Sequence, residues 1–254
     1  MDNIFPNIKS GVRFIESFFE EVFLENQGNI EELVFLINDE FRKSIVAFAA
    51  LEKPTVDIPY LLKAILKTVP QSMLDAKAIF DCDPAAGDLE EVINIYPGFF
   101  AISIYRVANQ FWKVGLTKCA RIISEHVHSK TGIDIHPAAT IGNAFAIDHG
   151  TGIVIGQTTV IGDRVKIYQG VTLGALQVSK SLHETKRHPT IENDVIIYSN
   201  ATILGGETVI GHDTIIGGNV WVTKSIPPNS MVFHKNEIVV RDLSLYPEAI
   251  NFCI

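Results

Sequence analysis

The residues of this sequence best suited to acid–base chemistry are one histidine and the carboxylates near it. His149 directly follows Asp148, and Asp134 lies 15 residues before the histidine. A carboxylate that holds an imidazole in one tautomer makes it a general base, and the pKa of histidine suits proton transfer near neutral pH. No serine nucleophile is then needed, because a substrate can supply the hydroxyl. The alternative is a structural histidine at a turn.

A second polar group is the run Arg187-His188-Pro189. Arginine pairs well with carboxylates because its planar guanidinium offers several donors in a fixed geometry. The group belongs to the stretch 174–190, which interrupts an otherwise regular pattern and is predicted to protrude as a loop. Long loops on rigid scaffolds commonly carry function. The alternative interpretation of Arg187 is a solvated loop end.

The elements that must position these residues follow from an aliphatic residue that returns every six positions between residues 133 and 222. The four series are Ile135, Ile141, Ile147, Ile153; Ile155, Ile161, Ile167, Leu173; Ile191, Ile197, Ile203; and Leu204, Ile210, Ile216, Val222. A period of six fits neither a helix nor an alternating strand. It is typical of the hexapeptide repeat of a parallel β-helix, in which short strands form the faces of a prism. A run of ordinary Ile-rich strands would leave the many Gly and Asn residues at the expected corners unexplained.

This prism predicts how the two carboxylates approach the histidine. With coils of about 18 residues, Asp134 lies nearly one coil before His149. Adjacent coils are stacked about 4.8 Å apart, so the Asp134 carboxylate can reach the imidazole. Asp148 is expected to orient the ring less well, because neighbouring side chains in a strand point to opposite faces.

The chain before the prism is expected to be helical from about residue 10 to residue 130. Ile15, Phe18, Phe19, Val22 and Phe23 have the spacing of one apolar helical stripe. The predicted class is therefore α+β, with a helical domain at 1–130 and a β-helix at 131–228 that carries the loop 174–190. A C-terminal tail at 229–254 completes the chain.

Composition excludes several classes of function. The chain has 254 residues, 47% of them hydrophobic, and a net charge of −8, so no basic face for nucleic acid is indicated. The N-terminus has no signal-peptide pattern, and no apolar stretch is long enough to span a bilayer. Cys82, Cys119 and Cys253 form no metal motif and indicate free thiols in a reducing compartment. We expect a soluble cytoplasmic protein.

Several motifs together resemble the serine O-acetyltransferases. The motifs in the prism are Asp134-Ile135-His136-Pro137-Ala138-Ala139, Asp148-His149-Gly150-Thr151-Gly152, Gly170-Val171-Thr172-Leu173-Gly174 and Arg187-His188-Pro189. Those in the helical part are Asp83-Pro84-Ala85-Ala86, Tyr96-Pro97-Gly98-Phe99 and Tyr105-Arg106. The resemblance covers roughly residues 80 to 230 and, more loosely, the rest of the helical part.

The resemblance implies a left-handed β-helix, a hand that the periodicity does not indicate and that the common crossover rule would not favour. It also implies acetyl transfer from acetyl-CoA to the hydroxyl of L-serine. The products would be O-acetyl-L-serine and CoA, in the first committed step towards cysteine. No metal is expected.

The same resemblance assigns roles to the residues already singled out. His149 would be the general base and Asp134 would hold its imidazole. Asp148 and Asp83 would bind the serine ammonium. These assignments agree with the residues themselves, because an amino-acid substrate needs two opposite charges placed apart.

For the other end of the substrate and for the cofactor, the resemblance points to the loop and to the prism edge. Arg187 would pair with the serine carboxylate, and His188 would assist there or steady the oxyanion of the tetrahedral intermediate. The expected CoA contacts are Gly174, Ala175, Ser199 and Gly218. Lys224 and Lys180 are candidates for the phosphates, since an acidic protein needs local positive charge to bind an anion.

The resemblance further implies partners. Prisms would pack side by side as homotrimers with each site between two subunits, and the helical domain would join two trimers. L-cysteine would be a feedback inhibitor at the serine site. Ile254 would enter the active site of O-acetylserine sulfhydrylase.

Three rival interpretations remain open from the sequence. His183 and His188 have the H-x4-H spacing of γ-class carbonic anhydrases, and His149 could complete a zinc site, although Arg187 would oppose the cation. The second interpretation is an acetyltransferase for a sugar or another hydroxyl acceptor. The charges of Asp83, Asp148 and Arg187 argue against it. A non-catalytic prism is the third, and the presence of both Asp134 and His149 argues against it.

Overall fold

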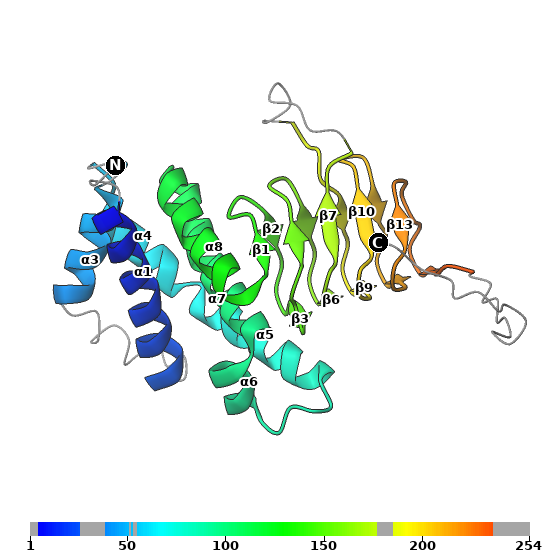
Figure 1. Ribbon diagram of the computed structural model, residues 1–254, viewed down its shortest axis with the longest axis horizontal. Helices are drawn as coiled ribbons and strands as arrows, with labels where there is room; N and C mark the ends of the chain where they lie inside the picture. The colour runs from blue at the N-terminus through cyan, green and yellow to red at the C-terminus, as the bar shows by residue number, and fades with distance from the viewer. Residues whose placement is uncertain (1–4, 26–38, 51, 53–54, 177–184, 236–254) are drawn as a thin grey trace, which may run out of the picture.

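The computed structural model describes residues 5–25, 39–50, 52, 55–176 and 185–235, which form a helical region followed by a stack of parallel strands (Figure 1). Lys180 and His183 of the predicted loop lie outside the described residues, as do Cys253 and Ile254 of the tail. The predicted class is confirmed, because the helices precede a parallel β-helix of about five turns.

The helices begin and end where local chemistry favours it. They are α1 (Phe5–Phe19), the π-helix η1 (Glu20–Glu25), α3 (Asp39–Ala49), α4 (Ile58–Leu66), α5 (Val69–Cys82), α6 (Leu89–Ile95), α7 (Pro97–Lys113) and α8 (Thr117–Thr131). Asp57 and Asp88 cap α4 and α6 by accepting a backbone N–H from the first turn. Pro59 and Pro70 lie in the first turns of α4 and α5, because a proline there forfeits no helical hydrogen bond. Gly132, with φ 69°, ends α8.

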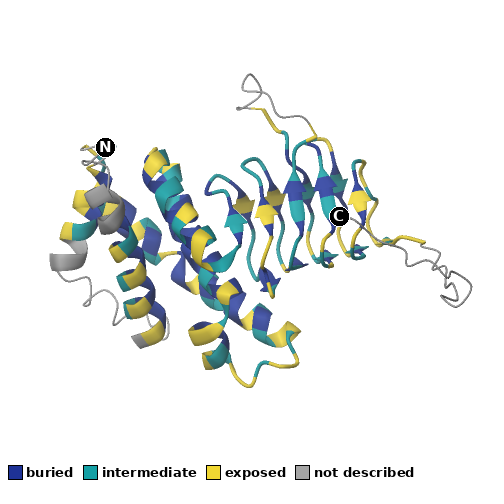
Figure 2. Cartoon of the chain, viewed as in Figure 1, coloured by how far each residue is buried: buried dark blue, intermediate teal, exposed yellow. Residues whose placement is uncertain are grey.

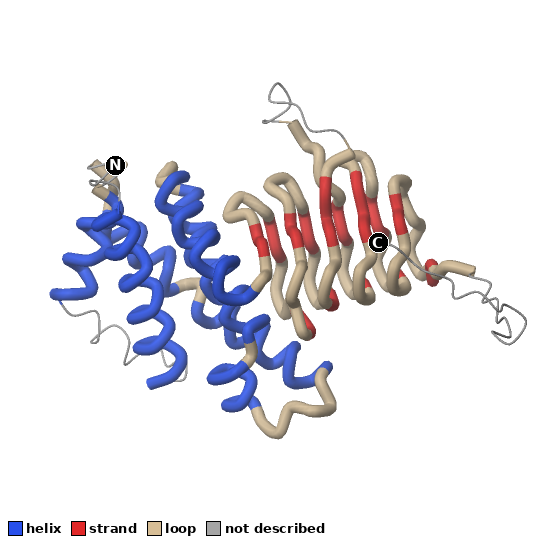
Figure 3. Tube along the Cα trace, viewed as in Figure 1, coloured by secondary structure: helices blue, strands red, loops and turns tan. Residues whose placement is uncertain are grey.

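In the described part of the chain, fourteen short strands form the three faces of the prism, and every pair between them is parallel (Figure 3). Sheet A contains β1 (Asp134–Ile135), β4 (Val154–Ile155), β7 (Thr172–Gly174), β10 (Thr202–Leu204) and β13 (Trp221–Val222). Sheet B contains β2 (Thr140–Ile141), β5 (Val160–Ile161), β8 (Thr190–Ile191) and β11 (Val209–Ile210). Sheet C contains β3 (Ala146–Asp148), β6 (Lys166–Tyr168), β9 (Ile196–Ile197), β12 (Ile215–Ile216) and β14 (Met231–Val232).

The six-residue period is confirmed as a set of buried ladders, except at Leu204, where the prediction was wrong because Ile203 is the inward residue of β10. On sheet A the inward column is Ile135, Ile155, Leu173, Ile203 and Val222, which are aligned from coil to coil and buried (Figure 2). Burying such side chains is the main driving force for stacking the coils, and β-branched residues suit the pleated wall. We call the corners between successive sheets the A–B, B–C and C–A edges. At the C–A edge His149, Asn200 and Asn219 have φ near 58°, which small or polar residues tolerate best.

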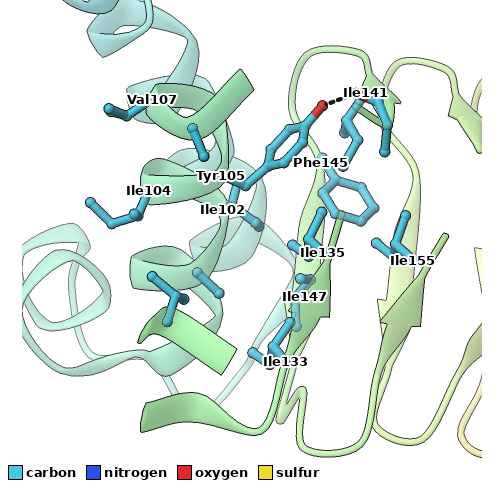
Figure 4. Packing of buried hydrophobic residues seen from close by; sticks show 14 of the residues in the cluster. Ile102, Ile104, Tyr105, Val107, Ile133, Ile135, Ile141, Phe145, Ile147 and Ile155 are labelled. Carbon is cyan, nitrogen blue, oxygen red and sulfur yellow. Dashed lines mark hydrogen bonds between the residues drawn. The ribbon is translucent and has the colours of Figure 1, made fainter. Parts of the chain in front are cut away.

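Helix α7 closes the end of the prism nearest the helical region. Tyr105 donates its hydroxyl to the carbonyl of Ala139 (2.5 Å), and Asn109 donates to the carbonyl of Pro137 (2.8 Å). The first coil has no preceding coil to pair with, so these side chains satisfy carbonyls that would otherwise be buried without a partner. Figure 4 shows Tyr105 beside Ile135 and Phe145 in this contact.

One buried ion pair joins the helices to the same coil. Arg106 donates from Nε to Asp75 (2.5 Å) and from an Nη to the carbonyl of Gly142 (2.7 Å). The side chain of Arg106 is 3% exposed and that of Asp75 is 0% exposed. Asp75 also accepts the backbone N–H of Phe145 (2.9 Å). Burial raises the pKa of Asp75, and Arg106 opposes this shift by stabilising the carboxylate. None of the described helices has the length and apolar composition needed to cross a bilayer.

Replacing Arg106 with Met should lower the free energy of unfolding by about 3–5 kcal/mol, because Asp75 is left as a buried carboxylate without its cation. Urea unfolding followed by circular dichroism measures this. Arg121→Met is the matched control, since Arg121 pairs with Glu125 on an exposed helix face and should cost about 0.5 kcal/mol or less. A loss below about 1 kcal/mol in Arg106→Met would contradict the role of this pair.

Candidate active site

The histidine predicted to be the base lies on the C–A edge, next to the helical region. It follows β3 directly, and its side chain is 73% exposed, so the imidazole is open to a substrate. Nε2 of His149 lies 3.7 Å from Oδ1 of Asp148, which ends β3. Both α5 and α7 contact β3, so the helical region forms one wall beside this edge.

The carboxylate nearest to His149 is therefore Asp148, although Asp134 was expected to reach the ring. Asp134 forms no ion pair with His149 within the described structure. The reason lies in the register, which aligns Asp134 with Val154 on sheet A, beyond the corner that contains His149. The orienting role of Asp134 stays a prediction.

Asp83 lies immediately after α5 and is held by two hydrogen bonds. The hydroxyl of Tyr96 donates to Oδ2 (2.7 Å), and the backbone N–H of Ala85 donates to Oδ1 (2.8 Å). These bonds, in this order, lower the pKa of Asp83, and the nearby charges of Lys166 and His149 add to the effect. The Asp83 carboxylate in turn raises the pKa of Tyr96 to about 12. The charge of His149 thus acts on the Asp83 carboxyl, whereas the binding of an ammonium group by Asp83 stays a prediction.

Lys166 lies close to these carboxylates, and the sequence analysis did not identify it. Its ammonium lies 3.0 Å from Oδ2 of Asp148 and donates to the carbonyl of Cys82 (3.1 Å). The residue occupies an ordinary outward position of the repeat, so no break in the period marks it. Its contact with Cys82 spans 84 residues of sequence, and no local pattern reports such a contact. We call Asp83, Asp148, His149 and Lys166 the C–A edge cluster.

The arginine and histidine of the loop lie on a different edge. Arg187 and His188 precede β8 at the A–B edge, where Arg187 donates to the side chain of Gln157 (2.6 Å). The N–H of Thr158 donates to Nδ1 of His188 (3.1 Å), which places the proton of the neutral imidazole on Nε2. Burial, with the charges of Arg187 and Lys186, lowers the pKa of His188 to about 4. His188 is therefore a neutral N–H donor at neutral pH.

The residues expected to bind CoA are also divided between two edges. Ser199 and Gly218 lie on the C–A edge in adjacent coils, where a Cβ added to Gly218 would lie 3.1 Å from the carbonyl oxygen of Ser199. Gly174 ends β7 and Ala175 follows it at the A–B edge, and the exposed Lys224 follows β13 there. Within one chain, neither the serine residues nor the CoA residues all meet at one edge.

The zinc interpretation required His183, which lies outside the described residues. His149 and His188 lie on different edges of the prism. Among the described residues, no group of three or more His, Cys, Asp or Glu side chains is arranged to hold a metal ion.

Comparison with known proteins identifies close relatives of this chain. A serine acetyltransferase encoded on a plasmid of Synechococcus elongatus is 51% identical over 227 residues, covering 81% of this chain and 70% of the relative. The serine acetyltransferase of Bacillus subtilis is 42% identical over 178 residues, covering 67% of this chain and 80% of the relative. No family model matches the chain.

Solved structures agree with these relatives. Serine acetyltransferase isoform 3 of Entamoeba histolytica, in complex with cysteine, superposes with a TM-score of 0.72 at 33% identity, covering 94% of this chain and 86% of that one. A serine acetyltransferase of Neisseria gonorrhoeae in complex with serine gives 0.63 at 31% identity, covering 74% and 78%. A serine acetyltransferase in complex with CoA gives 0.64 at 27% identity, covering 89% and 93%.

The buried, neutral His188 should make stability depend on pH. Its folded pKa of about 4 lies below the usual value of 6.5, so the folded state binds fewer protons than the unfolded state between these values. The stabilisation that the neutral, buried His188 gives the folded state is fully present above pH 6.5 and is lost as pH falls towards 4. We therefore expect the free energy of unfolding to fall less between pH 7 and pH 5 in His188→Asn, whose Oδ1 can still accept the Thr158 N–H.

Unfolding in urea at the two pH values measures this difference. His212→Asn is the matched control, because its side chain is half exposed and lies at the B–C edge. An identical loss of stability in His188→Asn and the wild type would contradict the assignment of a buried, neutral His188.

Proposed function

The chain belongs to the serine acetyltransferase family, and from this premise we propose how its residues perform the reaction of that family. The reaction transfers the acetyl group of acetyl-CoA to the hydroxyl of L-serine and gives O-acetyl-L-serine and CoA. The observation that carries the residue assignments is the C–A edge cluster. There, an exposed histidine lies 3.7 Å from the carboxylate of Asp148, and its charge acts on a second carboxylate, Asp83, from a different part of the chain.

In the proposed mechanism His149 removes the proton from the serine hydroxyl as its oxygen attacks the acetyl carbonyl carbon. The tetrahedral intermediate then collapses, the C–S bond breaks, and the imidazolium returns the proton to the sulfur of CoA. Asp148, 3.7 Å away, stabilises the imidazolium. Asp134 is retained as a second carboxylate that orients the ring, a role that requires the His149 and Asp134 side chains to approach each other when substrate binds.

Two sets of opposite charges would bind the zwitterionic part of serine. Asp83 and Asp148 would hold the ammonium, and Arg187 would hold the carboxylate. His188, as a neutral Nε2–H donor, would assist at the carboxylate or at the oxyanion. An acceptor with only one of these charges would leave a set unpaired, and this favours an amino acid over a sugar.

The division of these residues between two edges supports a homotrimer. Within one chain, Arg187 and His188 lie at the A–B edge and the C–A edge cluster lies elsewhere on the prism. If prisms pack side by side around a three-fold axis, the A–B edge of one copy faces the C–A edge of the next. The same packing would unite Gly174, Ala175 and Lys224 of one copy with Ser199 and Gly218 of another around acetyl-CoA.

Several finer assignments belong to the same proposal. The helical domain at 1–130 would supply Asp83 and join two trimers, the β-helix at 131–228 would carry the chemistry, and 229–254 would form the tail. Binding of L-cysteine at the serine site is supported by a relative solved with cysteine. Docking of O-acetylserine sulfhydrylase on Ile254 rests on the family resemblance. A reducing compartment, the cytoplasm, fits the free thiols of Cys82 and Cys119.

Release of the CoA thiol from acetyl-CoA with L-serine tests the reaction and the base together. We expect release by the wild type and a fall in kcat by a factor on the order of 10²–10⁴ in His149→Ala, as for the loss of a general base. His128→Ala, a variant of an exposed helical histidine, is the control and should behave as the wild type. A His149→Ala enzyme with full activity would contradict the assignment of the base.

Coexpression of two inactive variants tests whether the site lies between chains. Over all trimers formed by coexpressed His149→Ala and Arg187→Ala chains, about one quarter of the interfaces combine an intact C–A edge with an intact A–B edge when chains assemble at random. We expect about that fraction of wild-type activity, whereas each variant alone is nearly inactive. Mixed assemblies that remain inactive would indicate that both groups act from one chain.

A further inference from the structure

Lys166 is a buried cation in a row of apolar side chains. It begins β6 and faces outward from sheet C, where its neighbours in register are Ala146 and Ile196. The first coils of the prism and the end of α5 cover it, so that its side chain is only 11% exposed. A lysine at such a position costs free energy unless its charge is paired, and this directs attention to its partners.

Three groups surround the Lys166 ammonium. Oδ2 of Asp148 lies at 3.0 Å, the carbonyl oxygen of Cys82 at 3.1 Å, and the centre of the Tyr168 ring at 4.6 Å. The carboxylate, the carbonyl and the aromatic face all favour a positive charge. Burial alone would lower the pKa of Lys166, but Tyr168 and Asp148 outweigh it and raise the pKa above its usual value. Lys166 is therefore charged in the folded protein.

These contacts connect the two carboxylates proposed to bind the substrate ammonium. Asp148 belongs to the prism, whereas Cys82 is the last residue of α5 and directly precedes Asp83. The ammonium thus holds the end of α5 against β3 and sets the separation between Asp83 and Asp148. The charge of Lys166 also acts directly on the Asp83 carboxyl.

The charges of the cluster have a consequence for the ligand. Two carboxylates with one lysine leave a single net negative charge, which matches one ammonium group. Without Lys166 the two carboxylates would carry two negative charges, would repel each other, and would suit a divalent cation as well as an amine. A resident lysine therefore selects a singly charged amine.

We propose that Lys166 is a positioning residue that fixes the spacing of Asp83 and Asp148 and reduces their joint charge to the single negative charge that an amino-acid ammonium complements. This inference rests on the proposed function. It adds a residue that determines recognition of the amino group and that makes no contact with the reacting hydroxyl.

Steady-state kinetics of Lys166→Met with L-serine and acetyl-CoA tests this proposal on the full chain. We expect the KM for L-serine to rise tenfold or more, while the KM for acetyl-CoA and the kcat at saturating L-serine stay within about threefold of the wild type. Lys166→Arg keeps the charge and should recover part of the loss, although its fork cannot reproduce every contact. Lys77→Met, which removes an exposed lysine from α5, is the matched control and should leave both KM values unchanged.

The outcomes separate this proposal from the proposed function. A wild type that does not acetylate L-serine removes the proposed function itself. If the wild type is active, an unchanged KM for L-serine in Lys166→Met overturns the positioning role, as do equal changes in both KM values. If Lys166→Met does not fold, Lys166→Gln, which also removes the charge, decides: a selective rise in its KM for L-serine supports the proposal, and wild-type kinetics or equal changes in both KM values overturn it.

Discussion

The contact between α7 and the first coil of the prism is the interaction on which the site depends. A β-helix offers regular faces and edges, but its first coil exposes unpaired carbonyls, and nothing in the repeat itself determines what covers them. Here Tyr105, Arg106 and Asn109 donate to those carbonyls, and Arg106 also pairs with the buried Asp75 of α5. The helical region is thereby held in one position against β3.

The consequence for function is that residues from two parts of the chain meet at one edge. Asp83 follows α5, whereas Asp148, His149 and Lys166 come from the prism, and the ammonium of Lys166 bridges the two parts. The roles proposed for these residues fit this arrangement, because a base at a corner of the prism and carboxylates held by hydrogen bonds need little rearrangement when a substrate binds. The complementary charge of Arg187 lies on another edge, and for this reason the proposed mechanism requires an oligomer in which two such edges meet.

Much of this architecture could be predicted from the sequence, since a period of six has few structural solutions and the inward ladder follows from it directly. The position of His149 at a corner was weighed only as the alternative to a catalytic role, and the structure shows that it lies at a corner, with φ 58°. The position of Asp134 relative to His149 could not be predicted. The predicted coil length did not include the corner at Gly150 and Gly152, which offsets the register. Lys166 could not be found either, because its partner Cys82 is remote in sequence and its own position looks like any outward position of the repeat.

The central claim is that two opposite sets of charges on different edges recognise a zwitterion, and acceptor selectivity tests it most directly. Release of CoA from acetyl-CoA should be measured with L-serine, with ethanolamine, which lacks the carboxylate, and with 3-hydroxypropionate, which lacks the ammonium. The account predicts that kcat/KM falls by at least about 10²-fold for each truncated acceptor, because buried or partly buried charges are then left unpaired. Comparable kcat/KM values for all three acceptors would contradict it.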